Sequence, residues 1–127
     1  MDLRKVLPDL RAFVAEREWA RFHDPKNLAM AIASEAGELL ALFRWVKGED
    51  ADAFVREPAR RGDVEDEAAD VAITLLLFCE RAGIDLAAAI RRKMRKNRDN
   101  YPVAASKGTA ERPPRASAAR KRSPRQR

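Results

Sequence analysis

Apolar residues in the first hundred positions recur at intervals of three and four, which is the spacing of an amphipathic α-helix. The first such series predicts a helix over about 6–22, with Pro8 tolerated in its opening turn. Asp24 followed by Pro25 is typical of an N-cap with proline at the first helical position. A second helix is therefore expected to run from this point to about Trp45.

Residues 46–62 interrupt the helical pattern, because charged residues alternate there with glycine and proline. Such a composition favours a connection that holds at most a short helical turn. Asp63 can cap a third helix ending near Ala82, where Gly83 suits the left-handed C-terminal position. Asp85 can start a fourth helix, which is expected to reach about Asn100. Four helices predict an all-α, four-helix bundle.

Composition agrees with an all-α domain over residues 1–105, because Ala, Leu, Glu and Arg are abundant and the whole chain has only five glycines. The net charge of +6 is unevenly spread. Residues 1–105 carry 18 Lys and Arg against 19 Asp and Glu, whereas residues 106–127 carry eight against one. The nearly neutral first part gives no reason to expect nucleic-acid binding. Residues 106–127 also lack large apolar side chains and are expected to form a disordered basic tail, with weak nucleic-acid contact as one possible role.

The single cysteine, Cys79, rules out an intrachain disulfide and favours a reducing compartment. Its apolar surroundings, LLLFCE, predict a buried structural thiol. No stretch approaches the roughly 20 apolar residues of a membrane span. We therefore expect a cytoplasmic protein without a membrane partner.

Two acid pairs stand inside the most apolar stretches of the chain: Glu35-x-x-Glu38 and Glu67-x-x-Asp70. On a helix, residues three apart share a face, so each pair presents two carboxylates to one point. Each pair also continues an apolar stripe. Four negative charges facing a core would repel one another unless a cation neutralised them. The alternative is that the acids are solvated and paired with nearby arginines.

Magnesium is the metal that best fits four carboxylates, because it prefers oxygen ligands and is commonly completed by substrate phosphates. A phosphorylated substrate is therefore expected. Carboxylate-bridged iron bundles typically add Glu-x-x-His pairs. The only histidine here, His23, does not follow a glutamate by three residues, so a di-iron site is disfavoured.

Polar and aromatic residues elsewhere could complete a nucleotide site. Lys93, Asn97 and Tyr101 recur every four residues and share a helix face, from which they could contact phosphate or sugar. Trp19 and Trp45 could stack on a base. Each of these residues also has a structural alternative: a basic helix end for the first set, and core packing for the aromatics.

Taken together, these features resemble the MazG-like superfamily of all-α nucleoside triphosphate pyrophosphohydrolases, whose signature is E-x-x-E, a spacer and E-x-x-D. Here 28 residues separate Glu38 from Glu67. The resemblance covers about residues 3–104. Four segments carry it, in order: EREWARFHDPKNL, SEAGELLALFRW, DEAADV and KMRKNRDNYP.

The resemblance implies magnesium-dependent hydrolysis of a nucleoside triphosphate to monophosphate and pyrophosphate, with dCTP or a modified dCTP as the expected substrate. It implies that the chain forms a homodimer or homotetramer through its helices. Glu35 or Glu38 would be the general base. The implied metal ligands are Glu35, Glu38, Glu67 and Asp70. The implied substrate-binding residues are Trp19, Phe22, His23, Asn27, Trp45, Lys93, Asn97 and Tyr101.

Two positions depart from the animal members of the family that hydrolyse dCTP. Leu10 stands where those have a histidine, and Thr74 stands where they have a tyrosine. Both differences could alter the choice of base or sugar. Hydrolysis of dUTP or of other modified nucleotides is the alternative within the enzyme class. A non-enzymatic helical scaffold with a nucleic-acid-binding tail is the alternative outside it.

Overall fold

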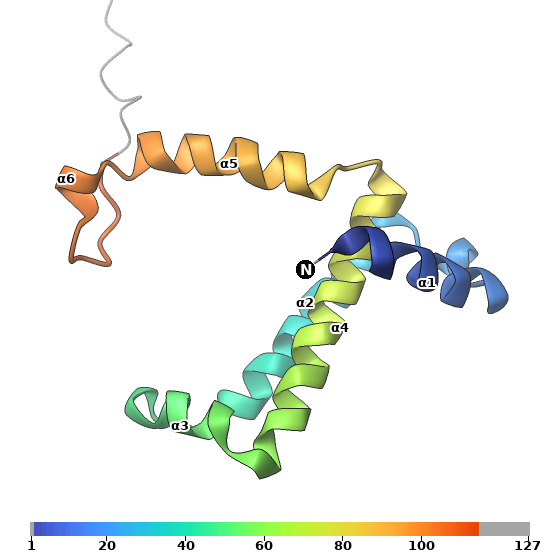
Figure 1. Ribbon diagram of the computed structural model, residues 1–127, viewed down its shortest axis with the longest axis horizontal. Coiled ribbons are helices and arrows are strands. Elements are labelled where there is room, and N and C mark those ends of the chain that lie inside the picture. Colours follow the sequence, from blue (N-terminus) through green and yellow to red (C-terminus); the bar gives the residue numbers. More distant parts are fainter. Residues whose placement is uncertain (1, 115–127) are drawn as a thin grey trace, which may run out of the picture. The chain divides into compact units, whose positions relative to one another are not determined.

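The computed structural model describes residues 2–114, and within that range the chain is helical without strands (Figure 1). This confirms the predicted all-α class. Among residues 2–114, no helix is long and apolar enough to cross a bilayer. The elements in chain order are α1 (Leu3–Glu16), η1 (Trp19–Phe22), α2 (Pro25–Phe43), η2 (Gly48–Asp50), α3 (Ala51–Arg56), α4 (Pro58–Ala82), α5 (Leu86–Asn100) and α6 (Val103–Ser106), where η marks a 3-10 helix.

The chain divides into two compact units, Met1–Ile84 and Asp85–Arg127, and each is described by itself. The expected domain boundary at residues 105/106 does not coincide with this division and stays a prediction. Residues 106–114 of the predicted disordered tail belong to the described chain. The rest of that tail, residues 115–127, lies outside the described residues.

Helices α2 and α4 lie side by side and form the main packed pair of the first unit (Figure 1). Leu28 of α2 is the most buried core residue, with 3% of its surface exposed. Cys79 of α4 is also buried, as predicted, and the loss of hydration raises the pKa of its thiol. The other buried apolar residues of the described chain are Val14 and Leu76.

Local signals at three helix ends behave as predicted. The Asp24 carboxylate accepts the Asn27 backbone N–H at 2.9 Å and caps α2. Asp85 caps α5 in the same way, by accepting the Ala88 N–H at 2.9 Å. Gly83 ends α4 with a φ of 64°, in the left-handed region that glycine enters without steric cost.

The predicted start of the third helix at Asp63 is wrong, because α4 already begins at Pro58. Proline suits the first helical position, where its missing N–H has no intrahelical role. Gly62 does not break the helix: glycine in a helix interior costs only about 1 kcal/mol relative to alanine. The preceding connection is correspondingly more helical than expected, since it holds η2 and α3.

The first predicted helix is also wrong in its extent. Helix α1 begins at Leu3, which places Pro8 inside it, and it ends at Glu16 instead of continuing to residue 22. Glu18 interrupts it with a φ of 53°, and the chain continues as η1. The second helix, α2, ends at Phe43, two residues before the expected Trp45.

Candidate metal centre

Three of the four predicted acidic ligands converge between α2 and α4. Ligand oxygens of Glu35 and Glu38 on α2 and of Glu67 on α4 all lie within 4.8 Å of one another. The sequence positions explain this arrangement: Glu35 and Glu38 share one face of α2, and α4 packs alongside that helix. Two helices therefore bring the carboxylates to a single point.

The acids have few polar contacts of their own. Glu35 and Glu67 are half-buried, whereas Glu38 is exposed. The Oε2 atom of Glu67 is buried, and no hydrogen-bond donor in the described part of the chain reaches it. A buried carboxylate oxygen without a donor is costly, and a cation is one way to satisfy it.

The electrostatics of the cluster favour a bound positive charge. Loss of hydration raises the pKa of Glu35, and the negative charges of Glu38 and Asp70 raise it further. The pKa of Glu67 is raised by the same causes, with an added contribution from Glu35. Protonation or a cation relieves this repulsion. The donor set, which is carboxylate oxygen throughout, fits a hard divalent ion such as magnesium.

Asp70 lies beside the cluster rather than inside it. It is exposed and is not part of the set of acids within 4.8 Å, although its charge acts on both Glu35 and Glu67. One turn further along α4, the Thr74 hydroxyl donates to the carbonyl oxygens of Asp70 and Val71, at 3.0 and 3.1 Å. The role of Asp70 as a metal ligand stays a prediction.

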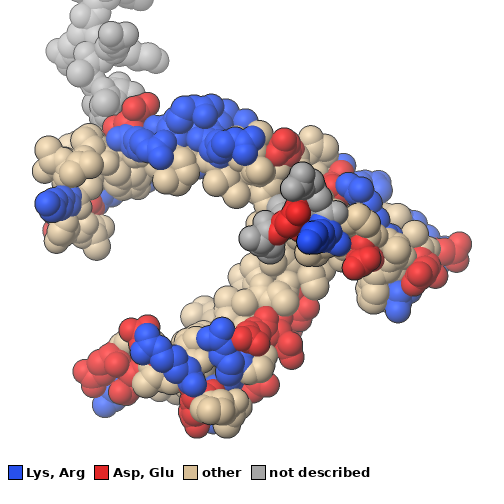
Figure 2. Space-filling model, viewed as in Figure 1, with Lys and Arg blue, Asp and Glu red and all other residues tan. Residues whose placement is uncertain are grey.

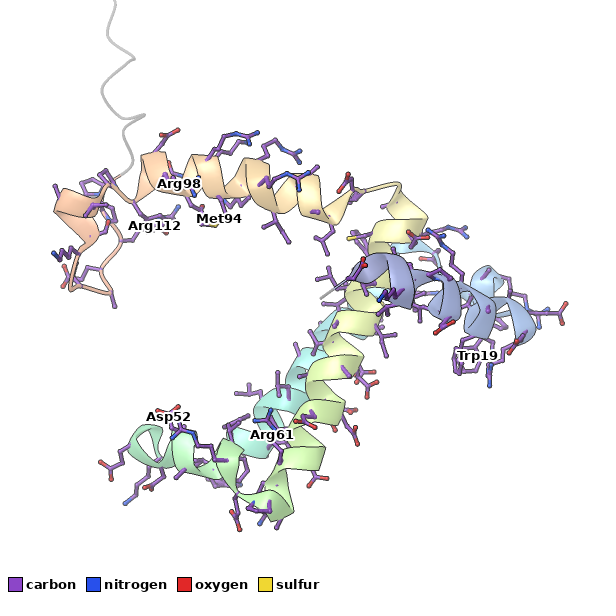
Figure 3. All side chains as sticks on the ribbon, in the orientation of Figure 1. Trp19, Asp52, Arg61, Met94, Arg98 and Arg112 are labelled. Atoms are coloured by element: carbon purple, nitrogen blue, oxygen red, sulfur yellow. The ribbon has the colours of Figure 1, made fainter. Side chains whose placement is uncertain are left out.

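Trp19, Phe22 and His23, which are three of the residues predicted to bind the nucleotide, lie in or directly after η1. The Trp19 ring lies edge-on to Phe13, with centroids 5.7 Å apart, and to His23, at 6.5 Å. Figure 3 shows Trp19 near the end of α1. Phe22 is exposed. Asn27 has a structural task here, because its side-chain amide donates to the Phe22 carbonyl at 3.2 Å and holds the turn before α2.

Trp45 lies just beyond α2 and is 88% exposed, so it takes no part in the core of the described chain. The guanidinium carbon of Arg44 lies 6.0 Å from the Trp45 ring centroid. An exposed indole at this place is free to meet a ligand or another chain.

The three residues predicted to contact phosphate or sugar from the fourth expected helix belong to the second unit. Lys93, Asn97 and Tyr101 recur every four residues along α5 and its C-cap, and so share a face. The Arg112 guanidinium carbon lies 5.9 Å from the Tyr101 ring centroid. The acids belong to the first unit, and the role of these three residues in substrate binding stays a prediction.

A cavity of about 280 Å³ in the first unit was not predicted from the sequence. Leu10, His23 and Leu77 are among its lining residues, and so are Arg11 and Glu80, which form an ion pair with each other. The signal was present: Leu7, Leu10 and Val14 lie on one face of α1. Leu10, which stands where the animal members of the family have a histidine, therefore gives this cavity an apolar side chain in place of a polar one.

Comparison with known proteins places these features in a family. The MazG-like family matches residues 30–112, a range that includes all four acids. The chain is 40% identical over 109 residues to dCTP pyrophosphatase 1 of Rattus norvegicus, covering 86% of this chain and 62% of that protein. It is 36% identical over 102 residues to dCTP pyrophosphatase 1 of Homo sapiens, covering 80% and 58%. The chain thus spans about three fifths of the length of these relatives.

A solved structure supports the same relationship. The crystal structure of a pyrophosphatase from Archaeoglobus fulgidus superimposes with a TM-score of 0.73 at 44% sequence identity, and covers 79% of this chain and 92% of that one. The sequence match and the structural match agree in fold and extend over most of the chain. This chain belongs to the MazG-like family.

Proposed function

We propose that the chain hydrolyses a nucleoside triphosphate to its monophosphate and pyrophosphate, with magnesium held by the acid cluster. The convergence of Glu35, Glu38 and Glu67 within 4.8 Å carries the proposal. The relatives named dCTP pyrophosphatase 1 and the archaeal pyrophosphatase support it. A bare cluster of acids repels a triphosphate, so substrate binding at this place requires a cation.

The residues can be assigned to tasks on this basis. Glu35, Glu38 and Glu67 would hold the metal, with Asp70 adding negative charge beside them. A bound divalent cation supplies neutralisation of the phosphate charge that develops during phosphoryl transfer. Glu35 or Glu38 accepts the proton of the attacking water as the general base. Lys93, Asn97 and Tyr101 contact phosphate or sugar.

We further propose dCTP, or a dCTP modified on its base, as the preferred substrate. Trp19, His23 and Trp45 would contact the base, because flat aromatic faces stack on bases with about 1–3 kcal/mol each. Phe22 and Asn27 would shape the turn that presents them. Leu10 and Thr74 leave dUTP or another modified nucleotide as the alternative, since both can change the polar contacts to the base.

A pyrophosphate-release assay over the common and modified triphosphates, with and without magnesium, tests this proposal. We expect pyrophosphate release only with a divalent ion, and the highest kcat/KM for dCTP or a base-modified dCTP. Release of inorganic phosphate in place of pyrophosphate would contradict the reaction class. A purine in first place would contradict the substrate assignment but not the reaction.

We also propose that the chain works as a homodimer or homotetramer in the cytoplasm, where Cys79 stays reduced. Only four apolar residues are buried in the described chain, whereas Leu40 and Met30 of α2 are 68% and 61% exposed. So many exposed large apolar side chains favour an interface between copies. Light scattering coupled to size exclusion measures the assembly directly, and a monomer at micromolar concentration would contradict it.

A further inference from the structure

Helix α5 has a partly apolar face and, opposite it, a basic face. Ile90, Met94 and Asn97 fall on one face, and Tyr101 continues it at the C-cap. The opposite face holds five exposed basic residues and one acid, Asp99. The basic residues, called the α5 basic face below, are Arg91, Arg92, Arg95, Lys96 and Arg98.

The charges of the α5 basic face are available for a partner. Among the described residues, none of the five forms a salt bridge or a side-chain hydrogen bond. Figure 2 shows Lys and Arg side chains gathered along α5. A shallow groove runs along the helix where the two faces meet, and Figure 3 labels Met94 and Arg98 among its lining residues.

The division of the chain into two units also separates its charge. Residues 1–84 carry 12 Lys and Arg against 17 Asp and Glu. Residues 85–127 carry 14 against three. The near-neutral balance of residues 1–105 therefore hides an acidic first unit and a strongly basic α5. The net charge of residues 1–105 is close to zero, as predicted, but the positive and negative charges lie in different parts of that range.

We propose that the α5 basic face binds the phosphate backbone of double-stranded nucleic acid, without sequence preference. Arg91 and Arg98 are about 10 Å apart along the helix axis at 1.5 Å per residue. A duplex presents about six phosphates over the same length, at one charge per 1.7 Å. Five basic side chains along this length match that charge density.

The composition of the face selects a duplex over other polyanions. Single-stranded nucleic acid is held by aromatic side chains on which bases stack, and the α5 basic face has none. An amphipathic helix that binds a membrane needs bulky apolar residues against the acyl chains. The opposite face of α5 exposes Ile90, Met94 and Tyr101, but Lys93 and Asn97 share that face and leave it without a continuous apolar surface. The binding surface is also distinct from the predicted basic tail, because all five residues lie within α5.

The test compares duplex binding of the full-length chain and of R91Q/R92Q/R95Q across a salt series. The probe is a fluorescent DNA duplex of about two helical turns, roughly 20 base pairs. Five phosphate contacts predict that a plot of log K, the logarithm of the binding constant, against log salt has a slope of about −4.5 or steeper. Removal of three contacts predicts a slope that is shallower by about 3. Between 50 and 200 mM salt this corresponds to a loss of at least about 500-fold for the wild type and roughly 10-fold for the variant.

K26Q/K47Q/R56Q is the matched control, because it removes three exposed positive charges from the first unit. We expect it to leave the slope unchanged. We also expect R91Q/R92Q/R95Q to keep its helical content and its nucleotide turnover, since glutamine is a good helix former and Lys93, Asn97 and Tyr101 lie on the other face. The activity readout thus separates this proposal from the proposed function.

Three results would overturn the proposal: equal loss in both triple variants, an unchanged slope in R91Q/R92Q/R95Q, or tighter binding to phosphatidylglycerol vesicles or to a single strand of equal length than to the duplex. The first would indicate a general charge effect. The second, with binding lost on deletion of residues 115–127, would assign binding to the tail alone. The third would assign the face to another class of partner.

Discussion

Ligand oxygens of Glu35 on α2 and Glu67 on α4 lie within 4.8 Å of each other, although the two residues belong to different helices. Their negative charges repel, and the charge of Glu35 contributes to the raised pKa of Glu67. This repulsion between two helices that pack against each other opposes the folding of the metal-free chain. A bound cation, as proposed above, would relieve the repulsion.

Removing one of these ligands should abolish activity without weakening the fold. We expect E67Q to lower kcat/KM by roughly 100-fold or more, because loss of even a residue that orients a metal ligand typically costs 10–100-fold. The free energy of unfolding without metal should hold or rise, since a charge is removed from a repelling cluster. Steady-state kinetics and urea unfolding measure the two effects.

E65Q is the matched control for E67Q. Glu65 lies on the same helix but is exposed and pairs with Arg61, away from the cluster. We expect near-normal turnover from E65Q. Near-normal turnover from E67Q and E38Q at saturating magnesium would instead contradict the metal site.

Magnesium should stabilise the folded chain through the same residues. A ligand present at about 100 times its Kd adds about 2.7 kcal/mol to the free energy of unfolding, provided that it binds only the folded state. We expect an increase of this size for the wild type and little change for E67Q. Thermal or urea unfolding with and without magnesium measures it. An equal increase in both proteins would place the ion elsewhere.

The parts of the fold that the sequence predicts correctly are set by local interactions. Asp24 and Asp85 cap their helices because a carboxylate meets a free N–H three residues on, and Gly83 ends α4 because only glycine enters its conformation freely. The start of α4 does not follow from local signals, because Gly62 and Pro58 are typical of a connection and yet lie within this helix. The helix continues through Gly62 at a cost that the surrounding helix formers offset.

In the candidate site, too, features set within one helix could be predicted from the sequence, whereas features set by the packing of two helices could not. The pairing of Glu35 with Glu38 follows from helical periodicity, so it could be predicted. The position of Asp70 outside the close set depends on how α4 is rotated against α2, which no local pattern fixes. The α5 basic face was missed because a charge count over residues 1–105 sums two units of opposite sign.

Gly62 within α4 and Gly83 at its C-cap should respond in opposite ways to replacement by alanine. Gly62 is in the helix interior, and a Cβ there would meet no atom within 4 Å. We expect G62A to raise the free energy of unfolding by about 0.5–1 kcal/mol. Gly83 has a φ of 64°, so G83A should lower it by about 1–2 kcal/mol. Urea unfolding of both variants decides this, and a destabilised G62A would indicate an interface at that position.

The ion pair between Arg11 and Glu80 should give stability its own dependence on pH. The Arg11 Nε donates to Glu80 Oε2 at 2.6 Å, and this bond lowers the pKa of Glu80 below its ordinary value of 4.5. A lowered carboxyl pKa contributes stability above pH 4.5, which is lost as the pH falls through the folded-state value. The contribution should be small, because the two side chains are 60% and 35% exposed.

The E80Q variant tests this by removing the titrating group. We expect E80Q to lose slightly less stability than the wild type between pH 5 and pH 3, in urea unfolding at low salt. Glu16 provides the control, because it is exposed and its carboxylate lies 3.6 Å from the neighbouring Arg17. The same pH profile in E80Q and in E16Q would show that the ion pair has no measurable effect.

Substrate choice should depend on the exposed aromatics rather than on the acids. Stacking and edge contacts distinguish bases, whereas metal and phosphate contacts are common to every triphosphate. Because Trp45 is 88% exposed, W45A should leave the free energy of unfolding unchanged and raise KM more for the preferred nucleotide than for poor ones. W19A should also destabilise the chain by about 0.5–1.5 kcal/mol, since Trp19 packs edge-on against Phe13. Measuring kcat/KM for dCTP, dTTP, dUTP, dATP, dGTP and CTP in both variants decides the matter: a uniform loss across all six nucleotides in W45A would exclude Trp45 from base recognition.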